Sequence, residues 1–448
     1  MHPIIAKSGR LQIDHHRKLA KRTTRIFQII PKKALLFGDD GTIVYGDSDE
    51  VIRQYEAAIE KNPKSAESHF QLGKIYLQKS SIDQAISHFE SAVKYKPGFA
   101  EALLNLGLAH FKKKQIDEAI KYYWSAIEYK KDFAQAYNYL GIAYHRTGQT
   151  EKAIEQYKRA LTIQKDYVEA HYNLAIAYDR KGAKNEAIKH YETVIKLRPN
   201  TAEAHYYLAM RYGLQDKVEL AKTHYDLAIK YKPNYAEAHN NLGYYYHQKG
   251  LMDDAIEHYK LAIKYKPNYS LAHNNLGYSY FVQGRLNEAI NEYGLAIKFQ
   301  PDFIKAYHNL GITHLRLEQF DDAIKQLNLA IALDSTNAEI LSNLGIAHYK
   351  KGQFDKAEKL YLMALELQAD FVQVHFNLGV LKYRRNDIES AIEHYEQAVG
   401  YKPDYSEAWY NLGLLYNENG MVEKAAQCFA TVRKLNKDSN FNPEKLEG

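Results

Sequence analysis

Residues 237–250 read EAHNNLGYYYHQKG, and a closely similar stretch, LAHNNLGYSYFVQG, occupies residues 271–284. Upstream, residues 203–216 read EAHYYLAMRYGLQD and residues 169–182 read EAHYNLAIAYDRKG. The interval between the starts of successive stretches is constant, so each is one copy of an internal repeat. The clustered His, Asn and Tyr of the first stretch must therefore be interpreted as repeat positions before a metal or catalytic site is considered.

Columns of small residues define the repeat units along most of the chain. An Ala occurs twelve residues after the eighth residue of every unit, and a large apolar side chain, usually aromatic, follows four residues later. We therefore divide residues 66–439 into eleven units of equal length, of which 236–269 is one. The eighth residue itself is always Gly or Ala, at Gly73, Gly107, Gly141, Ala175, Ala209, Gly243, Gly277, Gly311, Gly345, Gly379 and Gly413.

Each unit contains two apolar patterns with helical spacing. In the unit 236–269 the first pattern covers residues 239–246 and the second covers residues 255–263. Gly250 lies between them, where a helix would end, and Pro267 follows the second. One such helix pair has no core of its own, so we expect each pair to cover its apolar face with the next pair.

The units resemble the tetratricopeptide repeat family. The resemblance rests on the residues AHNNLGYYYHQKG…DDAIEHYKLAIKYKPN of 238–268 and on their equivalents throughout 66–439. It implies an all-α fold, a right-handed superhelical solenoid of antiparallel helix pairs.

The ends of the chain differ from these units. The stretch VIRQYEAAIEKNP matches the second helix of a unit, so we expect a capping half-repeat helix at 51–65. Residues 1–50 form a basic, non-repeat segment, of which 32–50 are expected to contain a short strand, a turn and a loop. A short tail, 440–448, follows the last unit.

Composition and charge limit the class of protein. The chain is 25% charged and 46% hydrophobic, and no apolar run approaches the roughly 20 residues that span a bilayer. Cys428 is the only cysteine, which excludes a disulfide framework and suits a reducing compartment, so we expect a cytoplasmic protein. The net charge is +6, but residues 1–38 contain nine Lys or Arg and one acid, so the repeat array is close to neutral.

The basic arm, residues 1–38, has several possible roles. Residues 11–30 can be drawn as a helix with Leu11, Leu19 and Ile26 on one face. Such a helix could contact an anionic membrane, nucleic acid or an acidic partner, or could serve as a targeting segment. It could equally be a solvated arm or a helix docked on the first units. Contact with nucleic acid or membrane is expected only through this arm.

Histidine recurs in two columns. The fourth residue of a unit is His at His69, His171, His205, His239, His273 and His375, and in the resembled family this position packs the helix pair, as Trp409 would here. The second column, His88, His190, His224, His258 and His394, is expected to be exposed. No zinc-protease, paired-cysteine or phosphate-loop motif occurs. We therefore expect no metal, no cofactor and no catalytic residues.

An asparagine row precedes the Leu–Gly or Leu–Ala pair in most units. An Asn amide offers two N–H donors and an acceptor, so a row of exposed Asn could pair with the backbone of an extended peptide. A similar row occurs in the repeat region of O-linked N-acetylglucosamine transferases, which these units resemble; alternatively the row is background of the repeat family. Its members are Asn105, Asn173, Asn241, Asn275, Asn309, Asn343, Asn377 and Asn411.

The resemblance also places the first helix of each unit on a concave groove. The ninth residues would form its apolar floor and the thirteenth residues would supply basic side chains, a combination that suits peptides better than nucleic acid. The clamp of chaperone-binding members needs a Lys at the fifth residue and an Arg at the sixth, which no unit has; Lys305 alone is not a clamp. The expected groove residues are Tyr244, Tyr278, Ile312, Ile346, Arg316, Lys350 and Arg384.

The sequence thus predicts a non-catalytic scaffold that binds extended or helical segments of other proteins, not small molecules, in this groove. One alternative is an adaptor or substrate-recognition subunit for a separate glycosyltransferase-like enzyme. A second alternative is an adaptor anchored to membrane or nucleic acid through residues 1–38. Self-association through the terminal units is also possible.

Overall fold

A computed structural model describes residues 36–37, 43–44 and 48–437. Two-residue strands β1 (Leu36–Phe37) and β2 (Ile43–Val44) pair antiparallel, with Leu36 opposite Val44. They lie in the segment where the sequence indicated a short strand and a turn. Helix α2 (Ser48–Lys61) overlaps the expected half-repeat and begins before residue 51. Most of the basic arm and the tail 440–448 fall outside the described residues.

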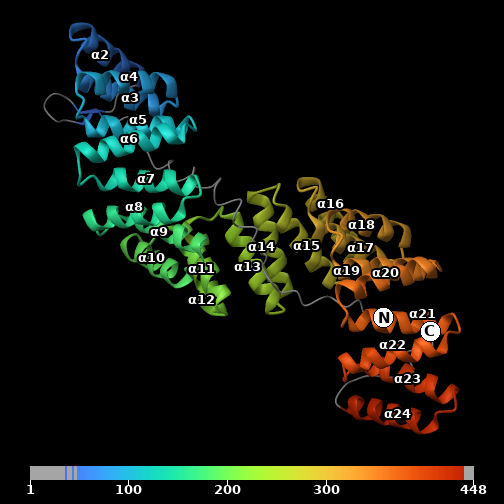
Figure 1. Ribbon diagram of the computed structural model, residues 1–448. Helices are drawn as coiled ribbons and strands as arrows, with labels where there is room; N and C mark the ends of the chain where they lie inside the picture. Colours follow the sequence, from blue (N-terminus) through green and yellow to red (C-terminus); the bar gives the residue numbers. More distant parts are fainter. Residues whose placement is uncertain (1–35, 38–42, 45–47, 438–448) are drawn as a thin grey trace. The chain divides into compact units, whose positions relative to one another are not determined.

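The described residues divide into two compact units, one ending at Pro233 and the other beginning at Asn234. Within each, antiparallel helix pairs stack one on the next (Figure 1). After α2 the first compact unit contains α3 (Ala66–Gln78), α4 (Ile82–Tyr95), α5 (Ala100–Lys112), α6 (Ile116–Tyr129), α7 (Ala134–Arg146), α8 (Thr150–Ile163), α9 (Val168–Lys181), α10 (Lys184–Leu197), α11 (Ala202–Leu214) and α12 (Val218–Tyr231).

The second compact unit continues the same alternation of first and second helices. It contains α13 (Ala236–Gln248), α14 (Met252–Tyr265), α15 (Ser270–Val282), α16 (Leu286–Phe299), α17 (Ile304–Arg316), α18 (Phe320–Leu333), α19 (Ala338–Lys350), α20 (Phe354–Leu367), α21 (Val372–Arg384), α22 (Ile388–Tyr401), α23 (Ser406–Glu418) and α24 (Val422–Lys437). The predicted all-α solenoid of helix pairs is confirmed.

The small-residue column lets the two helices of a repeat cross closely. A Cβ added to Gly141 on α7 would lie 2.5 Å from Cε1 of Tyr157 on α8, so only Gly admits this ring without a shift. Tyr157 is 2% exposed and packs in a cluster with Leu140 and Ala153. The aromatic column therefore fills the space that the glycine column leaves open, and this contact recurs along the array.

Turns between the helices need a left-handed residue. Gly182 has φ 82° and ends α9, and its amide donates to the carbonyls of Asp179 and Tyr178. Glycine adopts this conformation without the steric cost of a Cβ. In other units a residue that is not glycine adopts this left-handed backbone conformation, with φ between 59° and 69°. These residues are Ser80, Lys114, Asp216, Glu318 and Asn386.

Candidate functional site

First helices of successive repeats pack against one another. In the first compact unit α3 contacts α5, α5 contacts α7 and α7 contacts α9; in the second, α13, α15, α17, α19 and α21 make the equivalent contacts. The expected groove and Asn residues lie on these first helices, apart from Asn411, which lies on the first helix α23. Within each compact unit, we call the surface that its first helices form the first-helix face.

The Asn row is less exposed than the sequence suggested. Asn173 and Asn377 are buried, at 4% and 6% exposed, and the other members are half-buried. The expectation of an exposed row is therefore wrong for these two positions. The physical reason is that the surrounding repeats cover the amides, and for Asn173 the preceding repeat also supplies a polar partner.

Hydrogen bonds join the Asn row to the fifth residue of the preceding repeat. The Asn173 Nδ2 donates to Asn138 Oδ1 over 2.9 Å, and the Asn343 Nδ2 donates to the His308 ring over 2.8 Å. Two further bonds of this kind occur in the second compact unit. Asn275 donates to Asn240 over 3.1 Å, and Asn309 donates to Asn274 over 3.0 Å. The row thus has a structural role between repeats.

Three members of the row have other surroundings. Asn105 donates to the Glu101 carbonyl on its own helix, and Asn411 donates to the Tyr395 hydroxyl. Asn377 accepts from Gln373, while its Nδ2 is buried and has no hydrogen-bond partner among the described residues. The row is therefore not one uniform ladder of amides.

We predict that Asn173→Ala destabilises the fold by about 1–3 kcal/mol. The substitution leaves the Oδ1 of Asn138, a residue only 3% exposed, without the donor from Asn173, and an unsatisfied buried polar group costs about that much. Thermal and urea unfolding measure the change. The double variant Asn138→Ala/Asn173→Ala removes both partners and should unfold closer to wild type; equal losses in the single and double variants would contradict the account.

The expected basic residues also contact the preceding repeat. The Arg316 guanidinium donates to the Phe281 carbonyl over 3.1 Å and lies over its ring, 5.1 Å from the centroid. Arg384 donates to the Tyr349 hydroxyl over 3.3 Å. These side chains hold adjacent first helices together, and each guanidinium has further N–H groups beyond the one used in these bonds.

The apolar floor is present as half-buried side chains. Tyr244, Tyr278, Ile312 and Ile346 are each intermediate in exposure. Ile346 and Lys350 meet Asn377 at a shallow surface depression, whose other walls are Tyr349, Tyr361 and Val380. The structure thus brings three of the predicted residues together at the contact of α19 and α21.

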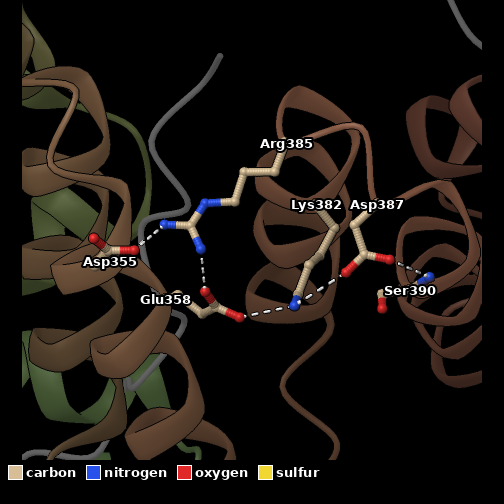
Figure 2. Close-up of polar contacts among 6 residues, drawn as sticks. All are labelled: Asp355, Glu358, Lys382, Arg385, Asp387 and Ser390. Atoms are coloured by element: carbon tan, nitrogen blue, oxygen red, sulfur yellow. Dashed lines mark hydrogen bonds and ion pairs between the residues drawn. The ribbon is translucent and has the colours of Figure 1, made fainter.

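An ion-pair network fastens the same two repeats on another side (Figure 2). Glu358 on α20 contacts Lys382 at 2.8 Å and Arg385 at 2.7 Å, and Arg385 also pairs with Asp355. Lys382 pairs in turn with Asp387, which accepts from the Ser390 amide at the start of α22. The network thus joins side chains of the two repeats, although its exposed members, such as Asp355, add little stability.

The two His columns meet. In five repeats the Nδ1 atoms of the two His, one from each column, lie 2.9–3.3 Å apart. The second His is half-buried in each, so the expectation that this column is exposed is wrong. The sequence held a signal for this contact, because both columns occur together in the same five units at one constant separation. The pairs are His69–His88, His171–His190, His205–His224, His239–His258 and His375–His394.

The described part of the chain contains no group of three or more His, Cys, Asp or Glu that could hold a metal ion. None of the helices described here has both the length and the apolar character needed to cross a membrane.

Family models described as tetratricopeptide repeats match residues 70–201, 245–371 and 381–439, which together make up more than half of the chain. No curated protein matches the sequence.

Among solved structures, the chain is similar to MamA, with 25% identity over 36% of this chain and 95% of that one, at a TM-score of 0.34. It is also similar to YrrB, described as a TPR protein with an unusual peptide-binding site, with 20% identity over 42% and 96% of the chains and a TM-score of 0.36. A chain of the APC/C hetero-tetramer Cut9–Hcn1 shows 14% identity over 88% and 91%, with a TM-score of 0.49.

Proposed function

Because the chain belongs to the tetratricopeptide repeat family, we propose that it is a non-catalytic scaffold that holds an extended segment of a partner protein on its first-helix face. The observation that carries the proposal is a row of half-buried apolar side chains beside amides that are only partly satisfied. Tyr278, Ile312 and Ile346 supply the apolar row in the second compact unit.

The neighbouring amides keep hydrogen-bonding capacity for a ligand. An Asn side chain has two N–H donors and two acceptor lone pairs. Asn275 uses one donor on Asn240 and one lone pair for Asn274. Asn309 uses one donor on Asn274. The remaining groups suit the alternating N–H and C=O groups of an extended backbone, while the apolar row takes its side chains.

Charge favours a peptide over nucleic acid. The second residue of a repeat unit is often acidic, and several of these carboxylates form ion pairs within their own repeat. Glu101 pairs with Lys130, and Glu203 pairs with Lys232. The basic residues Arg316 and Arg384 lie against the preceding repeat. No continuous row of unpaired cations is evident among the described residues of this face, whereas phosphate binding needs one.

We predict that Tyr278→Ser/Ile312→Ser weakens peptide binding at least tenfold. Peptides are first selected from a random linear library on the wild-type protein, and the Kd of the best peptide is then measured by calorimetry. Each substitution removes apolar area that a bound peptide would cover, and about 1.4 kcal/mol corresponds to a tenfold change in Kd. Circular dichroism checks that the variant is folded.

The matched control is Leu329→Ser/Leu333→Ser on the second helix α18, where the two side chains are 42% and 44% exposed. This variant should bind the peptide as wild type does. If it loses the peptide while Tyr278→Ser/Ile312→Ser keeps it, the binding surface is formed by the second helices and the proposal fails.

A further inference from the structure

The tautomer of each His pair follows from its surroundings. In four repeats the Nε2 of the fourth-residue His lies 2.9–3.2 Å from the carbonyl oxygen six residues earlier, and a carbonyl can only accept. In the last repeat Trp409 occupies the same place and donates its indole N–H to the Pro403 carbonyl over 2.9 Å. The His therefore carries its proton on Nε2, as a substitute for that indole.

This assignment leaves Nδ1 of the first His as an acceptor. The second His must then donate from its own Nδ1 across a gap of 2.9 Å in two of the repeats, so a neutral pair shares one proton between two nitrogens. The shared bond links the first helix of a repeat to its second helix. The Nε2 bond links the same His to the segment before the repeat. In the four repeats with this Nε2 bond, the pair thus fastens three parts of the chain.

Protonation has a limit in this geometry. A first proton, on the second His, keeps the shared bond but places a charge in a site where burial disfavours it. A second proton, on the first His, also removes the acceptor. Two N–H donors and two positive charges would then face each other at hydrogen-bond distance, in a site where burial already disfavours charge. A fully protonated pair must open.

The groups around the pairs do not stabilise a second charge. Burial, followed by repulsion from the first His, lowers the pKa of His88 and His394, and lowers that of His190 and His224 to about 4. Aromatic rings pack on the second His at Tyr76, Tyr178, Tyr212 and Tyr246, and on the first His at Tyr95, Tyr231, Tyr265 and Tyr401.

Charged side chains nearby are of both signs and act less strongly. The carboxylates raise the pKa of the second His, whereas the Lys side chains lower it further. They are Glu56 near His88; Glu186, Lys158 and Lys189 near His190; Glu192 near His224; and Glu358, Glu393 and Lys382 near His394.

One repeat provides a natural contrast. In unit 270–303 the partner of the fourth-residue His is Glu292, whose carboxylate lies 2.6 Å from the His273 Nδ1. Burial works against the charged imidazole, but the hydrogen bonds to Glu292 and to the Pro267 carbonyl outweigh it, and the net pKa of His273 is raised. This pair is strongest when protonated.

We propose that the five His–His pairs form a pH-sensitive lock, which is closed at neutral pH and opens in mildly acidic solution, while the repeat containing Glu292 stays closed. The sign follows from linkage. A lowered pKa means that the opened His binds protons that the locked His cannot, so the stabilisation is complete above about pH 6.5 and is lost as the pH falls toward 4. For His273 the sign is reversed.

Hydrogen exchange resolved by repeat tests the proposal on the full chain. Rates are compared at pH 7.5 and pH 5.0 after correction for intrinsic exchange. For a pair with a locked pKa of about 4, the opening equilibrium at pH 5 should rise on the order of thirtyfold relative to neutral pH. Faster exchange is expected in units 66–99, 168–201, 202–235, 236–269 and 372–405.

Repeats without a His pair serve as internal controls. Units 100–133 and 406–439 should change less than about twofold, and unit 270–303 should not open. Unit 304–337 is not a control, because burial lowers the pKa of its His308 to about 4. Replacement of the second His by the naturally occurring partner, as in His190→Glu and His224→Glu, should abolish the acid response of its own unit and leave the response of unit 372–405 unchanged. Equal acid responses in all units, or a response that persists in these variants, would overturn the proposal.

Discussion

Tyr157→Ala is expected to lower the free energy of unfolding by about 3–5 kcal/mol, the range found when a large buried aromatic is truncated. The ring of Tyr157 is 2% exposed and fills the space against Gly141. Its removal leaves a cavity between α7 and α8 that the backbone of two packed helices cannot close. Each repeat is stabilised by its neighbours, so the loss should extend to the adjacent repeats.

Hydrogen exchange and urea unfolding together measure this effect, because a long array need not unfold in one step. The matched control is Tyr157→Phe, which keeps the ring and removes only the hydroxyl, and it should lose much less stability. If the Ala and Phe variants unfold alike, the contact with Gly141 does not determine the stability of this repeat.

Asp179→Leu is expected to lower the free energy of unfolding by a similar amount, about 3–5 kcal/mol, because it removes one charge of a buried ion pair. Asp179 on α9 and Arg211 on α11 form an ion pair at 3.3 Å, with side chains only 7% and 11% exposed. Asp179 also accepts from the Tyr191 hydroxyl over 3.0 Å. Removal of the carboxylate leaves the Arg211 guanidinium buried without its counter-charge.

The double variant Asp179→Leu/Arg211→Leu distinguishes this cause from a loss of packing. Replacing both members of a buried ion pair by apolar side chains is often close to neutral, so the double variant should recover most of the stability. The measurement is a double-mutant cycle from chemical unfolding. A double variant less stable than Asp179→Leu alone would show that the charge imbalance is not the cause.

Most of the fold could be predicted from the constant repeat period. Gly141 and Tyr157 belong to columns that recur once in every unit, and their spacing already indicated two helices that cross closely. The helix pairs could therefore be predicted from the sequence, because the same local pattern is imposed on every unit. The His pairs were predictable in principle, since a constant separation along the chain joins the two columns.

Contacts that occur once could not be predicted in this way. Asp179 stands at a position that is usually apolar or aromatic, and its partner Arg211 lies in the next repeat, so no column links them. Such partners follow from the stacking of one repeat on the next and from side-chain orientation.

The central claim is that a partner segment lies on the first-helix face. Its most direct test is photo-crosslinking of a library-selected peptide that carries a benzophenone, followed by mass spectrometry to locate the attachment sites. We expect crosslinks to fall on α13, α15, α17 and α19, near residues such as Tyr244, Tyr278 and Ile346, and to disappear with excess unlabelled peptide. Competed crosslinks confined to the second helices α14, α16, α18 and α20 would contradict the account.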